Sequence, residues 1–165
     1  MVNHIRSQYE SFSNLIWKIA IGSSLSWELS RLLGSEHPYL APLSVIICIQ
    51  ATTDKTIKLA IQRVIGTIVG IPIVVLIANH LTINGLSLGL LILLGGYMTK
   101  WLKLSQQIMH QVALTILLVF VFEKRTENYA FDRMNDTLIG VMVAVLLQFI
   151  WSYFKRKQKN ASYKE

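Results

Sequence analysis

The sequence predicts an all-α integral membrane protein, a polytopic bundle of about six transmembrane helices. Hydrophobic residues make up 53% of the 165 residues and charged residues only 15%, and the mean hydropathy is +0.47. Several apolar runs approach the ~20 residues that a helix needs to cross the hydrocarbon core. None of them alternates with the period of two typical of a barrel strand. This composition argues against a disordered chain and against a small water-soluble domain.

Hydropathy divides the chain into six segments, at about 14–33, 39–51, 57–79, 83–102, 104–122 and 133–154. The first is interrupted by Lys18, Glu28 and Arg31. The second follows His37-Pro38, and with about 13 residues it is short enough to be re-entrant rather than spanning. Asn84-Gly85 marks the turn before the fourth, and the fifth ends in EKRTEN.

These boundaries give three regions along the chain. Residues 1–13 form a polar N-terminal segment, residues 14–154 the transmembrane module, and residues 155–165 a basic tail. No cleavable signal peptide is expected, because no small-residue cleavage site follows a short apolar core. The single cysteine, Cys48, lies in an apolar run and is expected to pack as a small hydrophobe.

The basic residues predict the orientation. Sixteen Lys and Arg against nine Asp and Glu give a net charge of +7, and much of the excess lies in the tail. Lys55, Lys58, Lys100 and Lys103 fall on the same side as that tail with either five or six spans. The rule that basic loops stay inside predicts a cytoplasmic C-terminus in a bacterial inner membrane and leaves the side of the N-terminus open. No nucleic-acid-binding motif accompanies the charge, so nucleic acid is not expected as a partner.

A short pattern occurs twice in the chain. Arg63, Thr67 and Gly70 fit R-x3-T-x2-G, and so do the residues 70 positions later, Arg133, Thr137 and Gly140. Two spans separate the copies, so the two helices would cross the membrane in opposite directions. We interpret this as an inverted three-helix repeat, a common transporter architecture, with chance similarity as the alternative.

The first copy has features of a packing helix and of a binding helix. Arg63, Gly66, Thr67 and Gly70 share one helical face, and Gly66-x-x-x-Gly70 allows close approach of another backbone. Pro72 removes a backbone donor and predicts a kink. The face is either a packed, kinked helix or a cationic, water-accessible surface beside a hinge.

Two carboxyl groups are candidates for carrying protons. Glu28 lies about 14 residues into the first segment, either as such a group or as a structural ion pair with Arg31. Asp136 is three residues from Arg133, so we expect an interfacial pair between them rather than a proton site. Lys18 is expected to extend toward the membrane surface.

Gln50 and Thr52 end the second segment and would either bind a ligand or close the turn. The four histidines show no metal-ligand spacing, so no metal is expected. There is neither a phosphate-binding loop nor a nucleophile–base motif, so neither a cofactor nor an enzymatic activity is expected.

The stretches APLSVIICIQATTDKTIKLAIQRVIGTIVGI and RMNDTLIGVMVAVLLQ resemble the fusaric-acid-resistance-like and aromatic-acid-exporter membrane domains. That family has a short helix ending in Q-x-T, a helix carrying R-x-x-G-T-x-x-G, and a later helix beginning with R and carrying D-T-x-x-G. The matching residues here are Gln50 and Thr52; Arg63, Gly66, Thr67 and Gly70; and Arg133, Asp136, Thr137 and Gly140. The likeness covers roughly residues 14–152.

The resemblance implies an inner-membrane module that exports small organic, often aromatic, acids by an ion-gradient-driven mechanism. Arg63 with Thr67, Gln50 and Thr52 would then contact the anion, and Glu28 or Asp136 would couple protons. Pro72, Arg133 and the motif glycines and threonines would shape the helices.

Fuller members of this family carry two modules or a cytosolic domain, so we expect this chain to form a homo-oligomer. Gly66/Gly70 and Gly85/Gly89 are candidate exposed packing faces for it. The alternative is a non-transporting membrane scaffold or interaction subunit.

Overall fold

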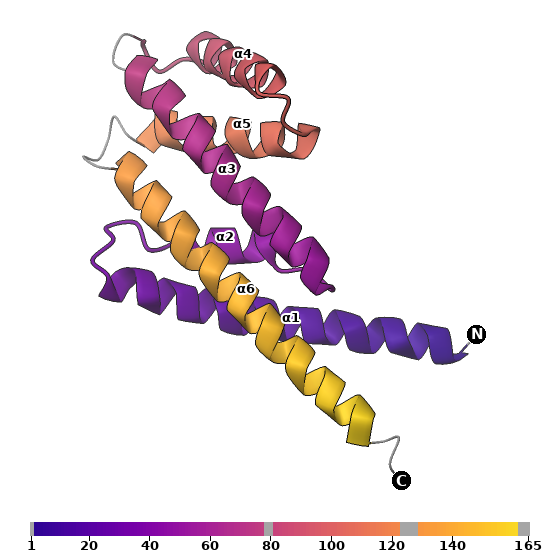
Figure 1. The fold of residues 1–165 in the computed structure, drawn as a ribbon. Helices are drawn as coiled ribbons and strands as arrows, with labels where there is room; N and C mark the ends of the chain where they lie inside the picture. The colour runs from indigo at the N-terminus through magenta and orange to yellow at the C-terminus, as the bar shows by residue number, and fades with distance from the viewer. Residues whose placement is uncertain (1, 78–80, 123–128, 162–165) are drawn as a thin grey trace.

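The computed structural model describes residues 2–77, 81–122 and 129–161, with side chains described from residue 13 to residue 157 within those ranges. Six helices and no strand occur in this part of the chain, which confirms an all-α fold (Figure 1). The helices are α1 (Val2–Leu32), α2 (Leu40–Cys48), α3 (Thr53–Ile77), α4 (Gly85–Trp101), α5 (Gln106–Phe122) and α6 (Tyr129–Ala161).

The helices follow the predicted segments, with shifts at their ends. The backbone of the predicted polar N-terminal segment is helical and continuous with the rest of α1. The helix α6 begins four residues before Arg133 and continues into the basic tail. The predicted end of the third segment at Asn79, the charged stretch 123–128 and tail residues 162–165 lie outside the described residues.

The second helix is short and ends in a tight reversal. α2 has nine residues, and the backbone N–H of Ile49 closes it on the carbonyl of Val45. The hydroxyl of Thr56 then accepts a hydrogen bond from the N–H of Gln50 at 3.0 Å and donates one to the carbonyl of Thr52 at 3.1 Å. This hydroxyl, within the first turn of α3, joins the end of α2 to α3, and Gln50 and Thr52 contribute only backbone groups to the turn.

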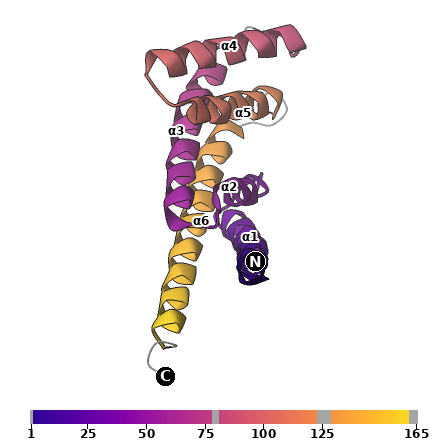
Figure 2. The ribbon, with the colours of Figure 1, turned by 90° about the vertical axis from the view of Figure 1, so that its right-hand side faces the viewer.

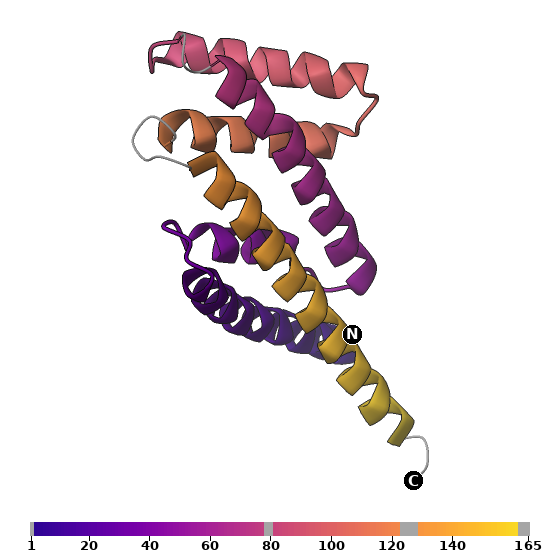
Figure 3. The ribbon, with the colours of Figure 1, turned by 60° about the vertical axis from the view of Figure 1, so that its left-hand side comes forward.

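Each helix runs opposite to the one before it, so the N- and C-terminal ends lie toward the same end of the molecule (Figures 1 and 3). The two long helices α3 and α6 are antiparallel and pack against each other. Helix α3 packs mainly on α5, which comes later in the chain, whereas α6 packs on the earlier α2. In Figure 2, α4 and α5 lie toward one end of the α3–α6 pair, and α1 and α2 lie farther along α6.

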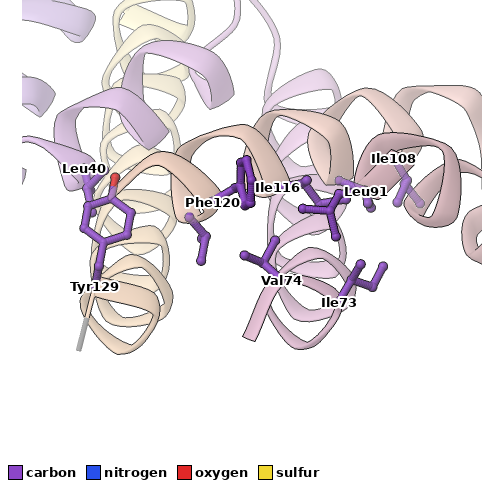
Figure 4. Close-up of a cluster of buried hydrophobic side chains, with 10 residues drawn as sticks. Leu40, Ile73, Val74, Leu91, Ile108, Ile116, Phe120 and Tyr129 are labelled. Carbon is purple, nitrogen blue, oxygen red and sulfur yellow. The ribbon is translucent and has the colours of Figure 1, made fainter. Parts of the chain in front are cut away.

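Two clusters of buried side chains hold this arrangement together. The larger one joins α3, α4 and α5 and reaches Leu40 of α2 and Tyr129 of α6 (Figure 4). The smaller one lies among α2, α3 and α6 and contains Val45, Ala60 and Cys48, which is buried and packs as expected. Helix α3 contributes to both clusters and therefore links them.

The repeat glycines are packing positions inside the chain. A Cβ added at Gly66 would lie 2.5 Å from the Cβ of Gln111 on α5, and one at Gly70 would lie 2.9 Å from Thr115. The expectation that Gly66 and Gly70 form an exposed oligomer face is therefore wrong, because α5 covers that face. Gly85 and Gly89 on α4 have open space around them. Helix α3 continues past Pro72 to Ile77 as one helix.

The contacts of the two repeat copies are equivalent. Gly70 approaches Val112 and Thr115 of α5. Gly140 approaches the residues 71 positions earlier than these, Ala41 and Ser44 of α2. The pattern that the sequence shows in α3 and α6 thus extends to the helices on which they pack.

The motif threonines also play the same part in both copies. The hydroxyl of Thr67 donates to the carbonyl of Arg63 at 2.9 Å, and that of Thr137 donates to the carbonyl of Arg133 at 2.7 Å. Both hydroxyls therefore stabilise the turn that carries an arginine.

Candidate functional site

The two motif arginines are the largest fully buried side chains in the described part of the chain. Arg63 and Arg133 each have 0% exposure, although they come from different halves of the sequence. The charge of Arg133 acts electrostatically on Arg63. Two positive charges therefore lie inside the fold, where burial makes a charge costly unless it is paired.

Arg63 is held by a polar contact between α3 and α5. Its Nη1 donates to Oε1 of Gln111 at 2.6 Å, while its Nε and Nη2 have no hydrogen-bond partner among the described residues. The preceding residue repeats the contact, because Nε2 of Gln62 donates to Oε1 of Gln107 at 2.7 Å. Gln111 holds the guanidinium group but supplies no negative charge.

Arg133 lacks even this contact. Its three guanidinium nitrogens are buried and have no hydrogen-bond partner among the described residues. The equivalence of α5 with α2 explains the difference, because the residue 71 positions before Gln111 is Leu40, which has no polar group. Together the two arginines present five buried nitrogen donors without an acceptor.

Such a pair is suited to holding an anion. A guanidinium group has its donors in a planar fork that fits the two oxygens of a carboxylate. Buried polar groups in proteins are normally hydrogen-bonded, so unsatisfied donors in one place call for an explanation such as a ligand or water. A carboxylate bound to either arginine would satisfy its free donors and offset its charge.

Asp136 acts electrostatically on Arg133, as the spacing suggested, but it forms no hydrogen bond with it in the described structure. The Asp136 carboxylate, also fully buried, accepts hydrogen bonds from the hydroxyls of Ser30 at 2.5 Å and Ser35 at 2.8 Å. The end of α1 and the loop after it close over this carboxylate, and the serines replace the arginine as its partners. Arg133 is left with its donors free in the described structure.

Glu28 lies in different surroundings from Asp136. It forms the ion pair with Arg31 that the spacing allowed, at 2.8 Å. The two side chains are 57% and 65% exposed, so the rest of the described chain does not enclose them. Of the two carboxyl groups, only Asp136 is inside the protein.

The structure brings together a polar cluster that sequence reasoning missed. Nδ1 of His37 lies 2.9 Å from Oδ2 of Asp132, which also accepts the N–H of Glu36 at 3.3 Å. Ligand atoms of the three residues lie within 4.8 Å of one another. The residues are about 95 positions apart, and the only sequence signal was His37-Pro38, which we treated as a helix breaker. Acidic groups gather in this way without a metal, so we assign the cluster no function.

The other predicted binding residues lie apart from the arginines or are already engaged. Gln50 and Thr52 belong to the turn before α3, and Thr52 lines a cavity that also contains Lys18 and does not contain Arg63. Thr67 uses its hydroxyl hydrogen within its own helix. Lys18 is only 5% exposed and donates to Oε1 of Gln148 at 3.0 Å, so neighbouring side chains cover it.

Comparison with known families gives one match. A sequence profile described as fusaric acid resistance protein-like matches residues 25–147, about three quarters of the chain. The match contains both arginine motifs, all of α2 to α5 and most of α6. No curated protein and no solved structure matches the chain.

Proposed function

Because the chain belongs to the fusaric acid resistance protein-like family, whose members are membrane transport proteins, we propose that it is a transporter module for small organic acids. In this proposal the module exports anions, aromatic carboxylates among them, across the bacterial inner membrane, driven by an ion gradient. The observation that carries the proposal is the pair of buried arginines, Arg63 and Arg133, with five donors unpaired in the described structure.

Two helices support the membrane location. Thr53–Ile77 in α3 and Tyr129–Lys157 in α6 are long and apolar enough to cross a bilayer, and Gln106–Phe122 is a shorter apolar helix. Large apolar side chains also face outward from the fold, among them Trp17, Leu76, Leu86, Trp101 and Phe131. Exposed apolar surface of this extent is costly in water and is favourable in lipid.

The alternating helix directions support a topology with both termini on one side. Lys55 and Lys58 lie in the first turns of α3, and Lys100 and Lys103 lie at the end of α4 and just after it. In Figure 1 these helix ends lie toward the same end of the molecule as the two chain termini. The basic side is the cytoplasmic side under the positive-inside rule, so we place the C-terminus in the cytoplasm.

The buried charges support an anionic substrate. A buried charge without a partner costs roughly 3–5 kcal/mol, and no carboxylate among the described residues forms a hydrogen bond with either arginine. An organic acid that binds Arg63 and Arg133 would lower this cost. Because α3 and α6 belong to different halves of the repeat, the bound anion would lie where inverted halves meet, as in many transporters.

We further propose that Asp136 couples protons to transport, with Glu28 as the second candidate. Asp136 is buried, is hydrogen-bonded by two serines and lies one helical turn from Arg133. Protonation of this carboxyl group would change the field at Arg133 and hence its affinity for an anion. Glu28 is exposed on α1, so it would act only where a partner or lipid covers that face.

The proposed assembly is a homo-oligomer, for which the α4 surface is the better of the two predicted faces. Gly85 and Gly89 have open space around them, and Leu86, Leu90 and Tyr97 of the same helix are exposed. Small residues on an apolar helix allow close approach of a second helix in lipid.

A flux assay tests the function. Vesicles that contain the purified chain and are loaded with phthalate, a dianion that leaks slowly, should release it faster than protein-free vesicles under a pH gradient. Arg63→Gln and Arg133→Gln should each lower the protein-dependent rate by about tenfold or more, the loss expected for a charge-assisted hydrogen bond.

Arg156→Gln is the matched control, because it removes the same charge from an exposed position near the end of α6. Equal losses in the Arg156→Gln, Arg63→Gln and Arg133→Gln variants, or no transport across a panel of aromatic and aliphatic carboxylates, would contradict the proposal. If no carboxylate is transported but the protein and its variants still form the same oligomer, the chain would be a scaffold subunit.

A further inference from the structure

A second polar cavity lies between α1, the start of α3 and α6, away from the arginine pair. It has a volume of about 260 Å³ and is lined in part by Lys18, Thr52, Thr53, Gln148, Trp151 and Lys155. No acidic side chain lines it. The cavity lies at the end of the molecule where the basic residues gather.

The lysines in this cavity are arranged for an anion. Lys18 is only 5% exposed. Its ammonium group donates to Oε1 of Gln148 at 3.0 Å and lies 5.7 Å from the centre of the Trp151 ring. Gln148 in turn donates to the hydroxyl of Thr53 at 3.5 Å. An ammonium group has three donors, and this one uses a single acceptor in the described structure. Lys155 acts electrostatically on Lys18, so two like charges share a cavity without a carboxylate.

An apolar groove lies along the seam between α3 and α6, and it shares no lining residue with the cavity. It has a volume of about 460 Å³, and its lining includes Ile57, Ile61 and Val64 of α3 and Val141, Val145 and Phe149 of α6. All of its lining residues are apolar. Ile57 is one helical turn from Thr53, and Phe149 is three residues from Ser152, which lines the cavity. The polar and apolar sites therefore follow each other on the same two helices.

We propose that the cavity and the groove together bind one anionic phospholipid. The phosphate group would lie between Lys18 and Lys155, with the Thr52 and Thr53 hydroxyls as further donors, and an acyl chain would lie in the groove. The chemistry of the cavity alone fits any phosphate, whereas the adjoining apolar groove favours a lipid. This inference rests on the membrane location proposed above, but it requires neither transport nor the arginine pair.

Lipid retention by the full chain tests the inference. The protein is purified in detergent, mixed with phosphatidylglycerol, phosphatidylcholine or inorganic phosphate, and passed through a sizing column. The bound lipid or phosphate is then measured. We expect retention of phosphatidylglycerol above phosphatidylcholine. Lys155→Gln should weaken it by about fivefold, the effect of one lysine near an anionic lipid.

Lys157→Gln, which removes the same charge from an exposed position outside the cavity, should leave retention unchanged. Val145→Phe, which fills the groove, should weaken lipid binding but not phosphate binding. Because Lys155 is exposed, its replacement is not expected to impair folding, and Lys18→Gln is compared only if it elutes like the parent protein.

Equal effects of Lys155→Gln and Lys157→Gln would overturn the inference, as would equal retention of the two lipids. If inorganic phosphate is retained as strongly as phosphatidylglycerol, and Val145→Phe does not change that retention, the cavity would bind a free anion instead. Failure of lipid binding with normal phthalate flux would leave the proposed function intact. A chain that stays monodisperse without detergent would remove the membrane location and both proposals.

Discussion

The helices α3 and α6 carry the same motif, but their arginines are held differently. In both, the motif threonine bonds to the arginine carbonyl and the last glycine packs against a neighbouring helix. The guanidinium group of Arg63 has Gln111 of α5 as a hydrogen-bond partner. That of Arg133 has none among the described residues, because the residue of α2 equivalent to Gln111 is Leu40. The motif thus specifies the backbone contacts, and the residues opposite it decide the chemistry.

The residue directly before the motif threonine shows the same division. Gly66 in the first copy lets α5 approach, and its counterpart in the second copy is Asp136, which is bonded by Ser30 and Ser35. The first copy gains tight packing at this position, and the second gains a buried carboxylate. Two copies of one framework have therefore become unlike in charge, and the following variants test that difference.

The largest effect is expected from filling the closest helix contact. A side chain at Gly140 would run into the backbone carbonyl of Ala41, which cannot move away without displacing α2. Gly140→Val should therefore lower the unfolding free energy by more than about 3 kcal/mol or prevent folding. Gly70→Val, which meets mainly the Thr115 side chain, should cost less. Thermal unfolding in detergent measures both, with Gly89→Val as a nearly neutral control. An equal loss for Gly70→Val would contradict the ranking.

Exchanging the arginine partners is expected to have the next largest effect. Gln111→Leu makes the surroundings of Arg63 resemble those of Arg133 and should cost about 2–3 kcal/mol, because it removes a bond to a buried charge. Leu40→Gln offers Arg133 an amide, so it should lower the free energy of unfolding by less than the burial of an unpaired polar group would. Unfolding temperatures of the two single variants and the double variant give the coupling free energy between positions 40 and 111. A neutral Gln111→Leu would show that the hydrogen bond does not stabilise the fold.

Removing the serine partners of Asp136 should have a smaller effect. Ser30→Ala and Ser35→Ala each delete one hydrogen bond to the carboxylate, and we expect a loss of about 1–2 kcal/mol for the buried Ser30 and less for Ser35. Ser24→Ala is the control, because that hydroxyl bonds only to its own helix on an exposed surface. The same unfolding assay measures all three, and a larger loss for Ser24→Ala would contradict the assignment.

The smallest effect is expected at the exposed ion pair. Glu28→Gln removes the charge that faces Arg31, and an exposed pair of this kind contributes about 0.5 kcal/mol or less. The unfolding temperature should hardly change and should not depend on salt. A substantial loss would mean that a second chain or lipid covers this face of α1, which would strengthen the case for Glu28 in proton coupling.

The sequence predicts the helices of this fold well, because long apolar runs leave few alternatives. It also predicts the arginine helices, since a buried ionisable residue repeated at one spacing is rare by chance. It does not predict that the charge of Arg133 acts on Arg63, because this depends on how α3 and α6 cross. The 70-residue offset was the signal, but we assigned Arg133 to packing.

Partners of charged groups were predicted poorly for the same reason. Spacing of three residues suggested that Asp136 pairs with Arg133, but the loop after α1 supplies Ser35 and the end of α1 supplies Ser30. Lys18 found Gln148, which is 130 positions away. Contacts within one helix turn can be inferred from spacing, whereas contacts between distant segments require the tertiary fold.

The shortness of α2 has an electrical consequence. Nine residues rise only about 13 Å, against a hydrocarbon layer of about 30 Å. The turn between Cys48 and Thr53 lies beside the basic residues and the polar cavity, so in a bilayer the start of α2 at Leu40 would lie well inside the layer. The membrane voltage would then fall mainly across the remaining, drier thickness. Moving a charge through that part would be voltage-dependent, and moving it through the part beside the loop before α2 would be much less so.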